Sequence, residues 1–148
     1  MTTKTTKVAS QDAAAFVERF IVAWAAPTVE RLEALLHPDV VLEQPMMPRM
    51  AGLDAAREGF GRLLGTFPGI HGEVLHWSAE DDVVFIEMRM IVPAGGRPLE
   101  WELTDRIKLE DGLVRERITY MDSAPLVLGV LTRPALWRSM PRMYLPRR

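Results

Sequence analysis

The chain has 148 residues, 48 % of them hydrophobic and 26 % charged, a composition typical of one soluble globular domain. It contains no cysteine, which excludes a disulfide framework and thiol chemistry. The formal net charge is −2, and no apolar run reaches the roughly 18 residues that a membrane helix needs.

The charge is unevenly distributed along the chain. Residues 123–148 contain five arginines and no acidic residue, whereas the rest of the chain carries 13 basic and 20 acidic side chains, a net charge of −7. Apolar side chains interleave with these arginines, so the pattern favours packing against the acidic body or a second subunit over binding nucleic acid. The N-terminus is polar and lacks the hydrophobic segment of a signal peptide, and we expect a cytoplasmic protein.

Two helices are predicted near the N-terminus, after a disordered arm at residues 1–10. Apolar residues at helical spacing predict an amphipathic helix over residues 11–26; they are Phe16, Val17, Phe20, Ile21 and Trp24. Pro27-Thr28 ends this helix and caps a short second one. His37-Pro38 stops the second helix, because the residue before proline avoids helical angles.

One strand and a third helix follow, and then four more strands. The first strand is expected at residues 40–44 and the third helix at residues 54–64. Tight turns join the later strands, which are expected at residues 70–79, 83–92, 99–109 and 113–121. This order predicts an α+β fold, in which a curved mixed or antiparallel sheet wraps around three N-terminal helices as a cone. We expect the domain to cover residues 11–123 and a basic, apolar extension to cover residues 124–148.

Asp105 interrupts the most regular strand of the chain. Between residues 99 and 109 apolar side chains alternate with polar ones, so one face of the strand lies in the core and the other in water. Asp105 falls on the apolar face, where a carboxylate is rare without a partner or a function. Two interpretations are open: a protonated acid that donates a hydrogen bond to a ligand, or an ion pair with Arg117 or Arg115.

The predicted cone has an apolar lining with few polar groups. Its expected lining residues are Trp24, Leu42, Met88, Met90, Trp101, Leu103 and Ile107. Such a lining suits a flat or irregular apolar ligand, although the same side chains could simply fill the cone as core. Gln44 either holds a water or a ligand carbonyl, or caps the end of its strand. The sequence has no metal, nucleotide or nucleophile motif, and we expect no metal site and no cofactor.

Several segments resemble the nuclear transport factor 2-like superfamily, which includes ketosteroid isomerases, SnoaL-like polyketide cyclases and limonene-epoxide hydrolases. The matching segments are RFIVAW at 19–24, HPDVVLEQP at 37–45, GLDAAR at 52–57, DRIKLEDG at 105–112 and YMD at 120–122. The resemblance covers about residues 11–123 and implies the cone-shaped fold. Because this fold often pairs through its sheet, the resemblance also implies a homodimer formed through the outer sheet face.

The catalytic positions of the isomerases are matched only in part. By this resemblance Gln44 stands where the isomerases have an aspartate base, and Phe20 stands where they have a tyrosine donor. Asp105 matches their second oxyanion donor, an aspartic acid. The isomerase site therefore lacks its base, which argues against ketosteroid isomerisation itself.

The sites of the other two groups are also incomplete. Gln44 matches a water-orienting asparagine of the epoxide hydrolases, but Met88 and Met90 replace their Arg-x-Asp pair. The last-strand acid of the hydrolases and of the SnoaL-like cyclases falls on Thr119, and the histidine of those cyclases falls on Asp105. The resemblance thus implies the fold more strongly than any one reaction.

We therefore predict a pocket for a hydrophobic small molecule such as a terpenoid, a steroid-like compound or a polyketide. In the catalytic interpretation, the protein is a cofactor-independent isomerase, cyclase or hydrolase with Asp105 as its acid. Gln44 polarises the substrate or holds a water, and Thr119 or Tyr120 assists. The alternatives are a non-catalytic binding or accessory protein and a structural dimerisation module. The expected ligand contacts are Phe20, Trp24, Leu42, Met88, Met90, Trp101, Leu103 and Tyr120.

Overall fold

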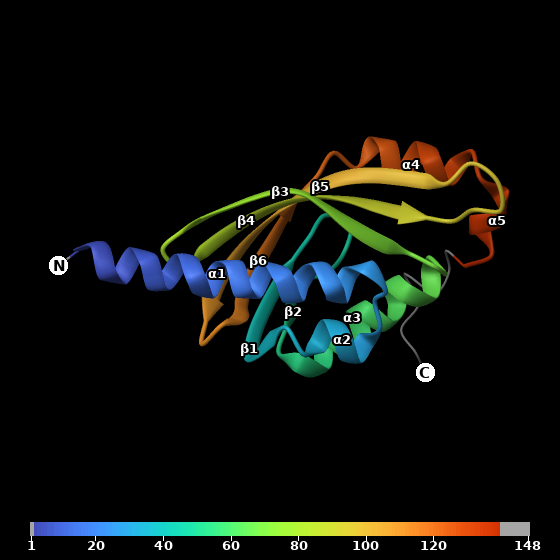
Figure 1. The fold of residues 1–148 in the computed structure, drawn as a ribbon. Coiled ribbons are helices and arrows are strands. Elements are labelled where there is room, and N and C mark those ends of the chain that lie inside the picture. Colours follow the sequence, from blue (N-terminus) through green and yellow to red (C-terminus); the bar gives the residue numbers. More distant parts are fainter. Residues whose placement is uncertain (1, 140–148) are drawn as a thin grey trace.

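The computed structural model describes residues 2–139, which form a six-stranded sheet with helices packed around it (Figure 1). The elements in chain order are α1 (Thr2–Ala25), α2 (Val29–Glu33), β1 (Leu36–Glu43), β2 (Met50–Ala51), α3 (Leu53–Thr66), β3 (His71–Glu80), β4 (Val83–Val92), β5 (Leu99–Glu110), β6 (Leu113–Tyr120), α4 (Ala124–Leu131) and α5 (Pro134–Trp137). The predicted α+β class is confirmed. No helix among the described residues is long and apolar enough to span a membrane.

The sheet is mixed and open. Its strand order is β2-β1-β6-β5-β4-β3, and β1 runs parallel to β6 while the other neighbouring strands are antiparallel. Because β2 and β3 are edges, the sheet does not close on itself into a barrel. Helices α1, α2 and α3 lie together on one side of it (Figure 1). The space between this helical layer and the sheet holds the core.

Aromatic side chains of α1 form the centre of that core. The ring centroids of Phe16 and Phe20 are 5.9 Å apart, and those of Phe20 and Trp24 are 6.2 Å apart. Trp24 also meets Phe60 of α3 edge-on, at 6.4 Å and 80°. Each such buried ring stabilises the fold by roughly 1.5–3 kcal/mol. The row of rings therefore fixes α1 against α3.

A glycine in β3 allows α1 to approach the sheet closely. A Cβ atom on Gly72 would lie 2.3 Å from Cε of Met88 and 3.4 Å from Cβ of Trp24. Any larger residue at this position would have to displace the end of Met88. Gly72 thus sets the distance between Trp24 and the sheet.

Several boundaries differ from the sequence-based expectations. Helix α1 begins at Thr2, before the start predicted at residue 11. Strand β1 begins at Leu36, so His37 lies in a strand and not at the end of a helix. Pro38 is tolerated there because the pairing of β1 with β6 is irregular between Leu36 and Val41, where a missing N–H breaks no ladder bond. The short strand β2 was not predicted.

The residues after β6 form two short helices that pack on the body of the same chain. Their buried side chains are Leu126, Val130 and Leu136. Arg133, between the helices, donates hydrogen bonds to the carbonyl oxygens of Arg97 at 3.2 Å and Pro98 at 3.0 Å. These bonds join the turn between α4 and α5 to the loop between β4 and β5. The rest of the expected extension, residues 140–148, lies outside the described residues.

Candidate functional site

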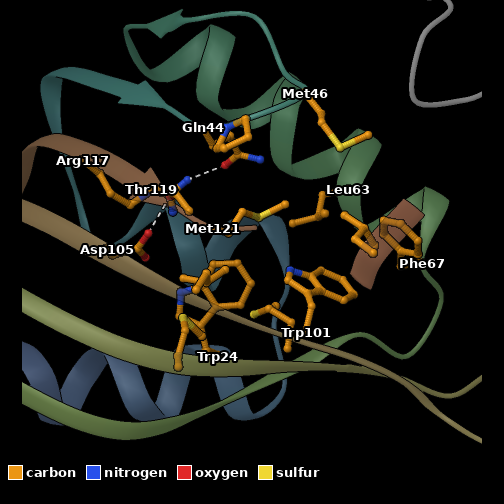
Figure 2. A pocket seen from close by; sticks show the side chains of 15 residues that line it. Trp24, Gln44, Met46, Leu63, Phe67, Trp101, Asp105, Arg117, Thr119 and Met121 are labelled. Carbon is orange, nitrogen blue, oxygen red and sulfur yellow. Dashed lines mark hydrogen bonds between the residues drawn. The ribbon is translucent and has the colours of Figure 1, made fainter. Parts of the chain in front are cut away.

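A cavity lies between the sheet and the helices, and its wall is largely apolar (Figure 2). It is lined by Trp24, Gln44, Pro45, Met46, Leu63, Phe67, Met88, Met90, Trp101, Leu103, Asp105, Arg117, Thr119, Met121 and Leu126. Its volume is about 60 Å³, which is room for a few water molecules. Small-molecule sites usually enclose about 300–1,000 Å³, so this cavity is small for its class.

The polar side chains of the cavity gather at one end. Figure 2 shows Gln44, Arg117, Thr119 and Asp105 together on one side, while Phe67, Leu63 and Trp101 lie on the opposite side. A ligand that follows this division has an apolar body and one polar group. The polar end decides its orientation.

Asp105 and Thr119 form a buried pair at the polar end. They are direct neighbours across the β5–β6 ladder, and their side chains are 2 % and 7 % exposed. The Thr119 hydroxyl donates a hydrogen bond of 2.5 Å to Oδ1 of Asp105. Burial raises the pKa of the Asp105 carboxyl, and the charge of Arg117 and the bond from Thr119 offset part of that rise. Burial has the larger effect, so the protonated form of Asp105 is favoured relative to an aspartate in water.

A β-bulge in β6 turns Arg117 and Thr119 toward this carboxyl. Lys108 of β5 pairs with Glu116 and Leu109 pairs with Val114, so Arg115 is an extra residue without a partner in the ladder. The bulge changes which positions face inward. Val114 is buried before it, and Arg117 and Thr119 are buried after it.

Arg117 is a buried cation whose partners are neutral. Its side chain is 6 % exposed, and its Nη2 donates a hydrogen bond of 2.8 Å to Oε1 of Gln44. The guanidinium carbon also lies 5.9 Å from the centre of the Phe60 ring. Nε of Arg117 is buried without a hydrogen-bond partner. Gln44 Nε2 in turn lies 2.7 Å from Sδ of Met47, so the amide is held at both ends.

The structure brings together most, but not all, of the residues predicted for the site. The three polar candidates Asp105, Gln44 and Thr119 line the cavity, together with Trp24, Met88, Met90, Trp101 and Leu103. Phe20 and Leu42 are buried core residues outside its lining. Tyr120 is 55 % exposed, because the bulge that turns Thr119 inward turns Tyr120 outward. These three predicted contacts therefore lie outside the cavity lining.

Arg117 has a different role from the one that the sequence indicated. We considered it as an ion-pair partner of Asp105, yet its hydrogen bond goes to Gln44. Six further lining residues were not predicted: Pro45, Met46, Leu63, Phe67, Met121 and Leu126. Met121 lies two residues after Thr119 and lines the cavity together with Arg117 and Thr119. This alternation is not evident in the sequence, because the bulge at Arg115 shifts which residues face inward. Leu126 comes from α4, whose position the local pattern of residues does not encode.

Metal-ligating groups meet at the surface and not in the cavity. His37, Glu110 and Asp111 bring one ligand atom each to within 4.8 Å of one another, and both acids are exposed. Among the described residues that line the cavity, Asp105 is the one carboxylate and there is no histidine. This lining does not offer a set of metal ligands.

Comparison with known families identifies the fold. The sequence pattern of the SnoaL-like domain matches residues 17–117, more than half of the chain, and the chain belongs to this family. No curated protein matches the sequence.

Solved structures give the same result. AclR from Streptomyces galilaeus, a candidate hydroxylase, is 21 % identical, with 84 % of each chain covered and a TM-score of 0.69. An LEH-like epoxide hydrolase from M. tuberculosis is 20 % identical, with 84 % of this chain and 92 % of that chain covered and a TM-score of 0.69. A candidate SnoaL-like polyketide cyclase from Jannaschia sp. CCS1 is 18 % identical, with coverage of 93 % and 96 % and a TM-score of 0.67. Identities this low show a shared fold and not a shared reaction.

Proposed function

We propose that the cavity binds a small, largely apolar molecule with an oxygen toward Asp105, and that Asp105 acts on this oxygen as a neutral acid. One observation carries the proposal: a carboxyl that is 2 % exposed lines an apolar cavity and accepts a hydrogen bond from Thr119 on one oxygen. That bond occupies Oδ1 and leaves Oδ2 to carry the proton. A neutral carboxylic acid in such surroundings donates a hydrogen bond to a carbonyl, enolate or epoxide oxygen. Ketosteroid isomerase, a protein of the same superfamily, is the known example of this device.

The chemistry that this arrangement supports is acid-assisted and needs no cofactor. As negative charge grows on the ligand oxygen, the hydrogen bond from Asp105 strengthens because the surroundings have a low dielectric constant. The positive charge of Arg117 stabilises the same oxygen. Gln44 positions Arg117 through its carbonyl oxygen, and in this way supports the acid indirectly. Opening of an epoxide, isomerisation and cyclisation are reactions of this kind where water, and not a side chain, accepts any proton that the substrate loses.

The size of the cavity limits the ligand. Four of the lining side chains are methionines, namely Met46, Met88, Met90 and Met121. A terpenoid, steroid-like or polyketide ligand needs more than the present 60 Å³, so it enters only if these flexible side chains move. Met46 is 41 % exposed and lies where such movement costs little packing.

A non-catalytic binding protein is the second candidate function. It is favoured by the lack of a base: among the described lining residues, Asp105 is the one carboxylate and no histidine accompanies it. A reaction that requires a side chain to remove a proton is therefore not supported. Binding alone requires the apolar wall and the polar end, and both are present.

We also propose that two copies pair through the outer sheet face, in the cytoplasm. Phe85 of β4 and Tyr120 of β6 are 40 % and 55 % exposed, and the strand register places both on the face away from the cavity. Exposed aromatic side chains are typical of protein interfaces. Sedimentation of the wild type and of Phe85→Glu tests this pairing: a dimer that becomes a monomer supports it, and a wild-type monomer refutes it.

The experiment for the main proposal measures turnover and ligand-induced melting shifts on a panel of epoxides, enones and polyketide-like esters. Wild type and Asp105→Asn are compared, with Asp81→Asn as the matched control. Asp81 lies in the β3–β4 turn outside the cavity and has a φ of 54°, which asparagine adopts as readily as aspartate. We expect a loss of turnover of about 100-fold or more in Asp105→Asn with binding retained, and no change in the control.

Each other outcome has a defined meaning. Melting shifts without turnover in the wild type support the binding protein. Equal turnover in the wild type and in Asp105→Asn refutes the acid role. If no compound of the panel shifts the melting temperature, the cavity is core and the main proposal fails.

A further inference from the structure

Arg117 is buried at the polar end of the cavity, and it forms an ion pair with no acidic side chain among residues that the structure describes. Its side chain is 6 % exposed and lines the cavity, its one hydrogen bond goes to an uncharged amide, and its Nε has no partner. A buried charge with neutral partners only is costly, and proteins normally pair it. A buried donor of this cavity-lining cation thus has no hydrogen-bond partner among the described residues.

Three acidic groups on β1, β5 and β6 do not supply the missing partner. Glu43, at the end of β1, forms an ion pair with Arg49 at 3.0 Å. Glu116 pairs with Arg106 at 3.5 Å on the outer face of the sheet. Asp105 accepts a hydrogen bond from the Thr119 hydroxyl and forms no ion pair with Arg117. The polar end therefore carries a net positive charge whenever Asp105 is protonated.

We infer that the natural occupant of the cavity is an apolar anion, and that its carboxylate accepts hydrogen bonds from Arg117 at the polar end. The apolar body lies against the tryptophans and methionines of the wall. A carboxylate is a group that a guanidinium recognises well, since two oxygens can meet two N–H donors side by side. The neutral Asp105 does not repel the anion and donates a further hydrogen bond to it. This inference rests on the proposed function, because it names the substrate class of the same cavity.

The test compares acids with neutral molecules of the same shape. Isothermal titration measures the affinity of butyrate and hexanoate against butanamide and hexanamide. We expect the wild type to prefer each acid over its amide by about 10- to 100-fold, the ratio that a hydrogen bond between charged groups is worth. Two chain lengths are used because the cavity is small.

Two variants separate the role of Arg117 from a general effect of charge. Arg117→Met removes the charge and puts a shorter, unbranched apolar side chain in its place, so we expect it to fold and to lose the preference for acids. Arg115→Met is the matched control on the same strand. Arg115 lies at the bulge and pairs with Glu110 at 3.2 Å, outside the cavity lining. It is expected to bind hexanoate as the wild type does.

A pH series with hexane-1-sulfonate checks the part played by Asp105, since this anion does not titrate. The cavity-lining residues of α1, α3, β4, β5, β6 and α4 include two ionisable groups, Asp105 and Arg117. Deprotonation of Asp105 places a negative charge beside the anionic ligand, and the two charges repel each other. Affinity is therefore expected to fall as pH rises in the wild type and to stay level in Asp105→Asn.

The outcomes distinguish this inference from the proposed function. If amides bind as tightly as acids to the wild type, or if the preference survives in Arg117→Met, the anion inference is overturned while the cavity remains a binding site. If neither acids nor amides bind to the wild type, the anion inference is overturned, and the panel of epoxides, enones and esters decides the proposed function separately. A preference for acids that Arg117→Met abolishes and Arg115→Met retains supports the inference.

Discussion

Asp105 and Arg117 are the two side chains on which the chemistry of the cavity depends. Both are almost fully buried, and neither is neutralised by the other through an ion pair. Thr119 fixes one oxygen of Asp105, and Gln44 fixes the guanidinium of Arg117. The two pairs hold a potential proton donor and a positive charge side by side at one end of an apolar space.

The pH dependence of stability provides a test at this scale. Burial raises the pKa of Asp105 in the folded protein above the unfolded value of about 3.9. The folded state then binds more protons than the unfolded state between the two pKa values, so the contribution of Asp105 to stability falls as pH rises through this window. Urea unfolding of wild type and Asp105→Asn at several pH values measures the difference. We expect the variant to gain stability relative to wild type with rising pH; a constant difference contradicts the raised pKa.

The sequence predicted the position of Asp105 but not its surroundings. The alternation of residues 99–109 places Asp105 on the buried face, and the structure agrees. The inward face of the last strand stayed ambiguous because a bulge at Arg115 breaks the two-residue period. A bulge is defined by how β6 pairs with β5, and the sequence of β6 alone does not reveal it. Arg117 was therefore recognised only as a possible partner of Asp105.

At the scale of elements, the close packing of α1 on the sheet shapes the cavity. Gly72 of β3 leaves room for the end of Met88, which lines the cavity, and for Trp24 of α1. The sequence predicted α1 from its periodicity and β3 from the turns that flank it. It did not reveal that a glycine in β3 sets their separation, because this role depends on a contact between residues far apart in the chain.

Substitution of Gly72 tests this packing. Gly72→Ala brings a Cβ to 2.3 Å from Cε of Met88, so we expect a loss of about 1–3 kcal/mol in the free energy of unfolding. Met88→Ala in the same chain makes room for the new methyl group, and the two changes should be less costly together than their sum. Gly61→Ala is the control; nothing lies within 4 Å of its Cβ, and we expect a gain of about 0.5–1 kcal/mol. Strictly additive effects of Gly72→Ala and Met88→Ala would contradict the contact.

At the scale of the whole molecule, the segment after β6 completes the cavity. Leu126 of α4 is part of the wall, and Arg133 ties the following turn to carbonyl oxygens of the β4–β5 loop. The sequence indicated an apolar, arginine-rich extension but not where it lies. The apolar residues of α4 surround the helix without a clear face, so their pattern does not define a docking direction.

Removal of the Arg133 contacts tests whether this segment closes the cavity. Arg133→Ala eliminates bonds to the carbonyl oxygens of Gly129, Arg97 and Pro98. We expect faster amide hydrogen exchange over residues 124–139 and a loss of about 1–2 kcal/mol in the free energy of unfolding. Arg138→Ala, an exposed change in the same segment, should leave the exchange as in the wild type. Unchanged exchange in Arg133→Ala would show that the buried apolar side chains hold the helices alone.

The most direct measurement is the titration of the Asp105 carboxyl by carbon-13 NMR, assigned through the signal that disappears in Asp105→Asn. The account predicts a midpoint well above the ordinary aspartate pKa of about 3.9, and a further rise in Thr119→Val, where a hydrogen bond that lowers the pKa is lost. A midpoint at or below the ordinary value would mean that Asp105 is an ionised counterion of Arg117. The cavity would then have no neutral acid, and the central claim would be wrong.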